Sequence, residues 1–173
     1  MAKVYERNIN IRVTDDGGDR VLLEATLLDL EHSIRIEMLV NVDSCGIEDA
    51  KAQMMKGPYT ICPQALEQMR NLVGLKIGRG ILHGVTKAVG GSAGCSHLVE
   101  VCQAAVQFGA NFLLGRKADF KGLGYEDHKQ WPEPAQIRLW LPVLRNTCHV
   151  FRESAVSDQP SAVSDGSAPE LTV

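Results

Sequence analysis

The chain has 173 residues, of which 45% are hydrophobic and 23% are charged, and its formal net charge is −3. This length suits one domain with a sizeable core, and the slightly acidic balance excludes an overall basic protein that binds nucleic acid or anionic lipid. The apolar runs are far shorter than a membrane span, and the first residues lack the apolar core of a signal peptide. We therefore expect a cytoplasmic protein.

The first third of the chain is expected to form antiparallel strands. Apolar and polar residues alternate there with the period of half-buried strands, in the segments 9–13, 21–28 and 33–42. Asp16-Gly17 is typical of the hairpin turn that would join the first two. The segment 47–55 has a helix-like composition, but its side chains also alternate, and we predict a fourth strand.

From Gly57 onward the pattern favours helices. Pro63 suits the first turn of a helix that ends at Gly74. The glycine-rich stretch 75–94 that follows leaves room for some helix before a loop, but it has neither of the glycine spacings that bind phosphate, so nucleotide binding is not supported. The apolar stripe of residues 96–114 then predicts a long helix.

The last third of the chain is less regular. Residues 119–134 read as a polar loop and residues 137–144 as a short strand or an interface segment. Residues 151–173 lack the apolar content needed to offset the entropy of ordering, and we predict a disordered tail there. The fold expected from these elements is one α+β domain over residues 1–150, with a three- to four-stranded antiparallel N-terminal sheet packed against C-terminal helices.

Cysteine and histidine side chains gather at the predicted helix starts and at one turn. Five cysteines, an odd number, favour free thiols or metal ligands over disulfides. Cys62 and Cys95 each precede a predicted helix, whose positive end favours the thiolate form. His97 follows Cys95, and His32 lies near Asp29 in the turn between the second and third strands. We predict His32, Cys62, Cys95 and His97 as zinc ligands, with Asp29 as their hydrogen-bonding partner or as an alternative ligand.

Five short segments carry a resemblance to domain-of-unknown-function family 2889 (DUF2889). They are Asp29–His32, Ile47–Ala50, Pro58–Cys62, Leu72–Leu75 and Gly94–Leu98. The resemblance covers roughly residues 5–115. It implies one domain and little about function.

The order of these elements also resembles the NifU-like iron–sulfur scaffold proteins. That likeness implies a sheet against helices with a metal site at one end, and it places Cys62 and Cys95 on two metal-binding cysteines of the scaffold. Where the scaffold has its remaining cysteine, this chain has Glu31-His32-Ser33. Because imidazole replaces a thiolate, this departure from the scaffold favours a stable zinc site, a site for another redox-inert metal or a vestigial site over an iron–sulfur cluster.

Three functions stay open at this point, and so does the question of whether the protein is an enzyme. The leading interpretation is a zinc-binding domain, with metal-assisted catalysis if one ligand position stays open. The second is a metal-independent thiol enzyme, in which Cys95 is the nucleophile and His97 or His32 the base. The third is a binding or assembly module that uses Trp131, Trp140 and the segment 137–144. A small-molecule or protein partner and a homo-oligomer are compatible with each.

Overall fold

The computed structural model describes residues 5–117 and 132–152 of the chain. The chain divides into two compact units, residues 1–118 and 119–173, and each is described by itself. The polar loop predicted at 119–134 and the disordered tail predicted at 151–173 lie almost wholly outside the described residues. The extent of the domain predicted for residues 1–150 stays a prediction.

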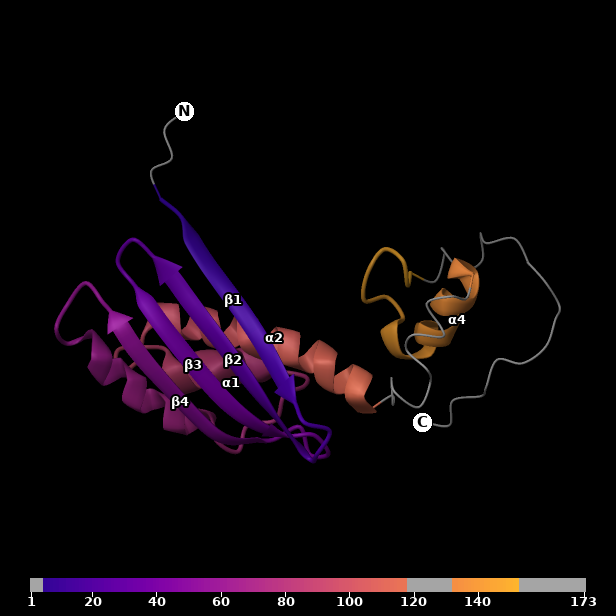
Figure 1. Cartoon of the computed structure of the whole chain (residues 1–173), viewed down its shortest axis with the longest axis horizontal. Helices are drawn as coiled ribbons and strands as arrows, with labels where there is room; N and C mark the ends of the chain where they lie inside the picture. Colours follow the sequence, from indigo (N-terminus) through magenta and orange to yellow (C-terminus); the bar gives the residue numbers. More distant parts are fainter. Residues whose placement is uncertain (1–4, 118–131, 153–173) are drawn as a thin grey trace. The chain divides into compact units, whose positions relative to one another are not determined.

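The first unit begins with a four-stranded antiparallel sheet in the order β1-β2-β3-β4 (Figure 1). The strands are β1 (Arg7–Asp15), β2 (Arg20–Asp29), β3 (Ser33–Asn41) and β4 (Ile47–Lys56). Alternate side chains of β2 and β3 are buried, as the period of the sequence predicted. The α+β fold with an N-terminal antiparallel sheet is confirmed, and segment 47–55 is part of a strand.

The pairing of the strands differs between the two edges of the sheet. β1 pairs with β2 without a break, from Arg7 opposite Asp29 to Asp15 opposite Val21. The pairing of β4 with β3 shifts register near both of its ends, between Ser33 and Ile34 and between Leu39 and Val40. Such irregularities bend a strand and disturb its ladder of hydrogen bonds, so the two edges present different surfaces.

Helices cover one face of the sheet (Figure 1). They are η1 (Cys62–Leu72), α1 (Ile81–Val89) and α2 (Ser96–Lys117). The helix predicted from Pro63 is present as the 3-10 helix η1. Its core-facing residues Leu66, Met69 and Leu72 are spaced by three, the spacing that aligns side chains on one side of a 3-10 helix.

The long helix α2 is the core helix of this unit and starts at Ser96, where the sequence predicted a start. Its length and composition alone would suit a membrane span, a test that core helices also pass. Leu98, Val101 and Cys102 are fully buried in the same core as the sheet. At Gly109 a β-carbon would lie 2.6 Å from a methyl group of Leu23, so this glycine permits the close approach of α2 to β2.

The described part of the second unit contains α4 (Glu133–Leu144). The prediction of a strand at 137–144 was wrong, because these residues are helical. The alternative of an interface segment stays a prediction. Pro134 stands in the first helical turn, where the missing N–H of proline has no cost. Trp131, one of the residues predicted to form a binding surface, lies outside the described residues.

Candidate metal centre

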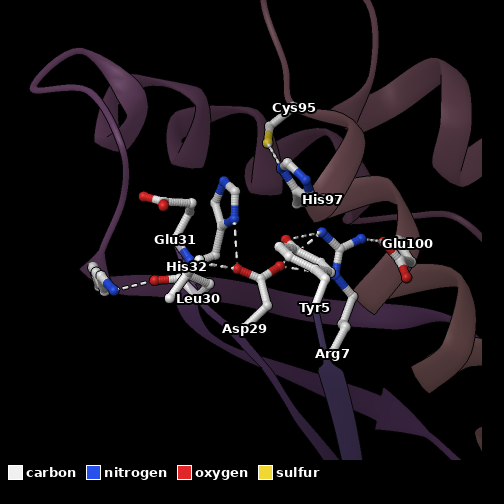
Figure 2. A network of polar contacts seen from close by, with 10 residues as sticks. Tyr5, Arg7, Asp29, Leu30, Glu31, His32, Cys95, His97 and Glu100 are labelled. Atoms are coloured by element: carbon white, nitrogen blue, oxygen red, sulfur yellow. Dashed lines mark hydrogen bonds and ion pairs between the residues drawn. The ribbon is translucent and has the colours of Figure 1, made fainter. Parts of the chain in front are cut away.

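The turn between β2 and β3 is built by the side chain of Asp29. Asp29 Oδ1 accepts the backbone N–H groups of Glu31 and His32, each at 2.8 Å. The backbone N–H of Asp29 donates to the carbonyl of His32 at 3.0 Å and closes the turn. Aspartate favours such turns because its short side chain reaches the amides two and three residues ahead. The geometry of this turn places the imidazole of His32 next to Asp29 (Figure 2).

The same carboxylate is held from the other side by Arg7 of β1. Nε and Nη2 of Arg7 lie 2.9 and 2.7 Å from Asp29 Oδ2, and the side chain of Asp29 is fully buried. Nη1 of Arg7 pairs with Glu100 in the first turns of α2, and Nη2 contacts the hydroxyl of Tyr5 at 3.4 Å. This network joins β1, β2 and α2 below the two imidazoles (Figure 2).

The network fixes the charge of Asp29. Burial alone raises the pKa of this carboxyl, but hydrogen bonds from the Glu31 amide, Arg7 and His32 outweigh burial and hold the pKa well below its usual range. An ionised carboxylate only accepts hydrogen bonds. The 3.0 Å contact between Asp29 Oδ1 and His32 Nδ1 therefore requires a proton on Nδ1. In the neutral imidazole this leaves a lone pair on Nε2, the form of histidine that binds metals.

The second imidazole comes from the start of α2. The ring centroids of His97 and His32 are 3.8 Å apart, with an angle of 38° between the ring planes. Burial lowers the pKa of His97, and the charges of His32 and Arg7 lower it further, against the opposing charges of Asp29 and Glu100. His97 is consequently neutral at neutral pH. Ligand atoms of Asp29, His32 and His97 all lie within 4.8 Å of one another.

Cys95 stands directly before α2 and faces His97. Its Sγ lies 3.7 Å from His97 Nδ1 (Figure 2). The loop after α1 directs Cys95 there, because the backbone N–H of Cys95 donates to the carbonyl of Val89 at 2.9 Å. Within this loop a β-carbon on Gly94 would lie 2.0 Å from the same carbonyl oxygen. Only glycine fits this position, so the glycine-rich loop serves to position the cysteine.

Cys62 is the first residue of η1 and is half buried. A β-carbon on Gly57, which follows β4, would lie 3.2 Å from the β-carbon of Cys62. Since the end of β4 pairs with Ser33, Cys62 lies toward the same end of the sheet as His32. The structure thus brings His32 and His97 together with Asp29, and Cys95 against His97. Among the described residues neither Cys62 nor Cys95 belongs to the group of Asp29, His32 and His97 whose ligand atoms lie within 4.8 Å of one another.

The contact between Cys95 and His97 has about the separation expected of two ligands of a tetrahedral zinc. Zinc binds sulfur at about 2.3 Å and imidazole nitrogen at about 2.0 Å, which puts two such ligand atoms about 3.5 Å apart. The separation of 3.7 Å between Cys95 Sγ and His97 Nδ1 is close to that value. Asp29 already receives five donor contacts, from Arg7, His32 and the Glu31 amide, whereas a carboxylate offers about four lone-pair sites. Asp29 thus suits the role of a partner that orients His32 better than that of a ligand.

Sequence reasoning missed Arg7, Glu100 and Tyr5. Arg7 and Glu100 are 93 residues apart in the chain, and only the packing of α2 on the sheet brings them together. One signal for Arg7 was present. Arg7 is in phase with the alternating residues Ile9, Ile11 and Val13, so a charged residue lies on the helix-facing side of β1. A charge in such a position requires a partner.

Comparison with known proteins gives a family and no function. The model of the family described as "Protein of unknown function (DUF2889)" matches residues 5–110, which include every residue of the candidate centre. No curated protein matches the chain, and no solved structure matches it.

Proposed function

Because the chain belongs to the DUF2889 family, whose function is unknown, we propose a function from the geometry of the site: a zinc-binding domain. The ligands in this proposal are His32 Nε2, His97 Nδ1 and Cys95 Sγ, and Asp29 orients His32. The observation that carries it is the placement of two neighbouring imidazoles and a thiol, with the sulfur 3.7 Å from the nearer ring nitrogen.

The polar network supports this proposal because it leaves atoms available that can bind a metal. Arg7 pairs with both Glu100 and Asp29, so its single positive charge is shared between two carboxylates and the three groups keep a net negative charge. The hydrogen bond to Asp29 then fixes which nitrogen of His32 carries its proton. Carboxylate–histidine pairs of this kind orient metal-binding imidazoles in many proteins. The lowered pKa of His97 also favours the neutral form that binds a metal.

Three protein ligands leave the fourth position of a tetrahedral zinc open to water or substrate. Bound zinc in such a site acts as a Lewis acid and lowers the pKa of a bound water. Cys62 is the alternative fourth ligand, as the likeness to NifU-like scaffolds implies, and it would close the site. These two arrangements differ in function, since a closed four-ligand site is structural.

Elemental analysis of the untagged full chain, purified anaerobically, tests the proposal. We expect about one zinc per chain, lost from His32→Gln, His97→Gln and Cys95→Ser. His83→Gln and Cys148→Ser are the matched controls, because both side chains are exposed, and they should retain the metal. Wild-type protein that stays metal-free after reconstitution with zinc would contradict the proposal.

Cobalt substitution separates the open site from the closed one. A thiolate-to-cobalt charge-transfer band should appear in the wild type, and if Cys95 is the only thiolate ligand it should vanish in Cys95→Ser. In Cys62→Ser the band should keep its intensity if the site has three protein ligands, and it should weaken if Cys62 is the fourth. The Cys62 variant thereby also tests the implied likeness to the scaffold proteins.

A metal-independent thiol enzyme is the second candidate, favoured by the same contact between Cys95 and His97. In that case the imidazole is the base that removes the proton from the thiol. Iodoacetamide would then alkylate Cys95 in wild type faster than in His97→Gln, at a rate that a chelator leaves unchanged. Under the zinc proposal, removal of the metal should instead increase the rate of alkylation.

A further inference from the structure

The edge strand β1 has neither the lysines nor the bulges that often prevent pairing with another chain. In the residues that the structure describes, β1 is hydrogen-bonded to one neighbouring strand, β2 (Figure 1). Its nine residues pair with β2 in one register from Arg7 to Asp15, without a bulge. An edge of this length and regularity offers a row of N–H and C=O groups to another strand.

The opposite edge of the sheet differs in this respect. β4 is irregular near both of its ends, where its register with β3 shifts. It also carries Lys51 and Lys56 as exposed residues. Bulges and lysines are common means of protecting an edge strand. The edge at β1 is therefore the better candidate for pairing.

Side chains on the helix-facing side of β1 are apolar and incompletely covered. Ile9, Ile11 and Val13 pack against the core but are each only partly buried. The four inner residues of β2 that follow the same alternation, in contrast, are all fully buried: Val21, Leu23, Ala25 and Leu27. A strand added beside β1 would cover the remaining apolar surface of the three residues.

The sequence of β1 is complementary to itself in the antiparallel direction. With a two-fold axis at Ile11, no two like charges meet within Arg7–Asp15, and apolar residues meet apolar residues there. In this register Arg7 lies opposite Asp15, Asn8 opposite Thr14, Ile9 opposite Val13, Asn10 opposite Arg12, and Ile11 opposite its own copy. A two-fold axis at Arg12 would instead place the two guanidinium groups side by side, and Arg12 has no ion-pair partner among the described residues.

We propose that β1 is a dimerisation edge, at which two copies of this chain pair antiparallel about an axis at Ile11 and join their sheets into one of eight strands. Such an interface is isologous, since each copy contributes the same surface. Main-chain hydrogen bonds hold the two strands together, and the side chains fix their register. Zinc binding is not required for this pairing, and the proposal stands whether or not the metal site exists.

Sedimentation equilibrium of the full chain over a range of concentrations tests the proposal. We expect a reversible dimer in the wild type. Asn10→Asp places two carboxylates opposite the two Arg12 side chains and should tighten the dimer about threefold. Because Asn10 is exposed, this substitution leaves the core intact. Gln53→Asp, at an exposed position of β4, is the control and should leave the dimer unchanged.

Ile11→Lys tests the axis directly, because it places two ammonium groups next to each other. Dimerisation should weaken at least tenfold in this variant, with the fold checked by circular dichroism. Concentration-dependent protection of the β1 amides from hydrogen exchange should accompany dimerisation in the wild type. A chain that is monomeric at all concentrations, in both wild type and Asn10→Asp, would overturn the proposal. A weaker dimer in Asn10→Asp would overturn the axis at Ile11.

Discussion

An ion pair joins β1 to α2 at each end of the two elements. Among the described residues, only one of these ends also carries a group of side chains placed to bind a metal. At the first end, Arg7 of β1 pairs with Glu100 near the start of α2. At the second end, Asp15 of β1 pairs with Arg116 in the last turn of α2, at 3.0 Å. Both ion pairs fix the long helix across the sheet.

The partners of the two ion pairs differ. Arg116 and Lys117 at the second end each donate to a backbone carbonyl of a turn, those of Gly17 and Asp43, at 2.8 Å. Arg7 at the first end contacts a fully buried carboxylate, which in turn orients His32. The second end needs few partners to hold the helix in place. The first end therefore has more buried polar groups than the attachment of α2 requires, as the proposed metal site would explain.

Replacement of the aspartate at each end by asparagine should give the largest difference in stability between the two ends. In Asp29→Asn the buried Arg7 contact and the turn lose their charged acceptor, and we expect a loss of about 4 kcal/mol in the free energy of unfolding. Asp15 is partly exposed, and Asp15→Asn should cost about 1 kcal/mol or less. Urea denaturation of the metal-free proteins measures both. Equal losses in the free energy of unfolding would show that the network at the first end only holds α2 on the sheet, as the ion pair at the second end does.

Two glycines offer the next comparison. At Gly94 a β-carbon would lie 2.0 Å from the carbonyl oxygen of Val89, so Gly94→Ala must displace the loop that positions Cys95. We expect a loss of about 3 kcal/mol and a weaker affinity for zinc. Gly17 has φ +87° and no atom near its missing β-carbon, so Gly17→Ala should cost about 1 kcal/mol and leave zinc binding unchanged. Urea denaturation and a zinc titration check both outcomes.

The strands of the sheet were predictable because their signal is local. Alternation of apolar and polar residues is a property of neighbours in the chain, and it located β2 and β3 correctly. η1 was expected as an ordinary helix, since a spacing of three also occurs on an α-helix. The helix α4 was missed because the short apolar run 137–144 was read as a strand or an interface segment and Pro134 was not recognised as part of a first helical turn.

The candidate centre was predictable only where its residues lie at the ends of local elements. His32, Cys95 and His97 stand at a turn and at a helix start, so the sequence identified them as candidate ligands, but it did not predict whether they meet in space. Arg7 was missed because its partners depend on how α2 crosses the sheet. That crossing depends in turn on the fit between Gly109 and Leu23, which no local pattern encodes.

The smallest effect that we expect is a pH dependence of stability that arises from His97 at the first end. Burial and the charges of His32 and Arg7 lower the pKa of His97 in the folded state below the value of about 6.5 that it has when unfolded. Between these two values the unfolded chain binds the proton and the folded chain does not, so stability falls as the pH falls through this window. One proton limits the slope to about 1.4 kcal/mol per pH unit.

Urea denaturation of the metal-free protein at a series of pH values from 7 downward measures this slope. His97→Gln should flatten it, whereas the exposed His83→Gln should leave it unchanged. Asp29 contributes in the same direction but only at lower pH, because its stabilising charge is lost as the pH falls below about 4 and through its own lowered pKa. A slope that persists in His97→Gln above pH 5 would show that another group at the first end titrates there, and the neutral state of His97 would then have to be measured directly.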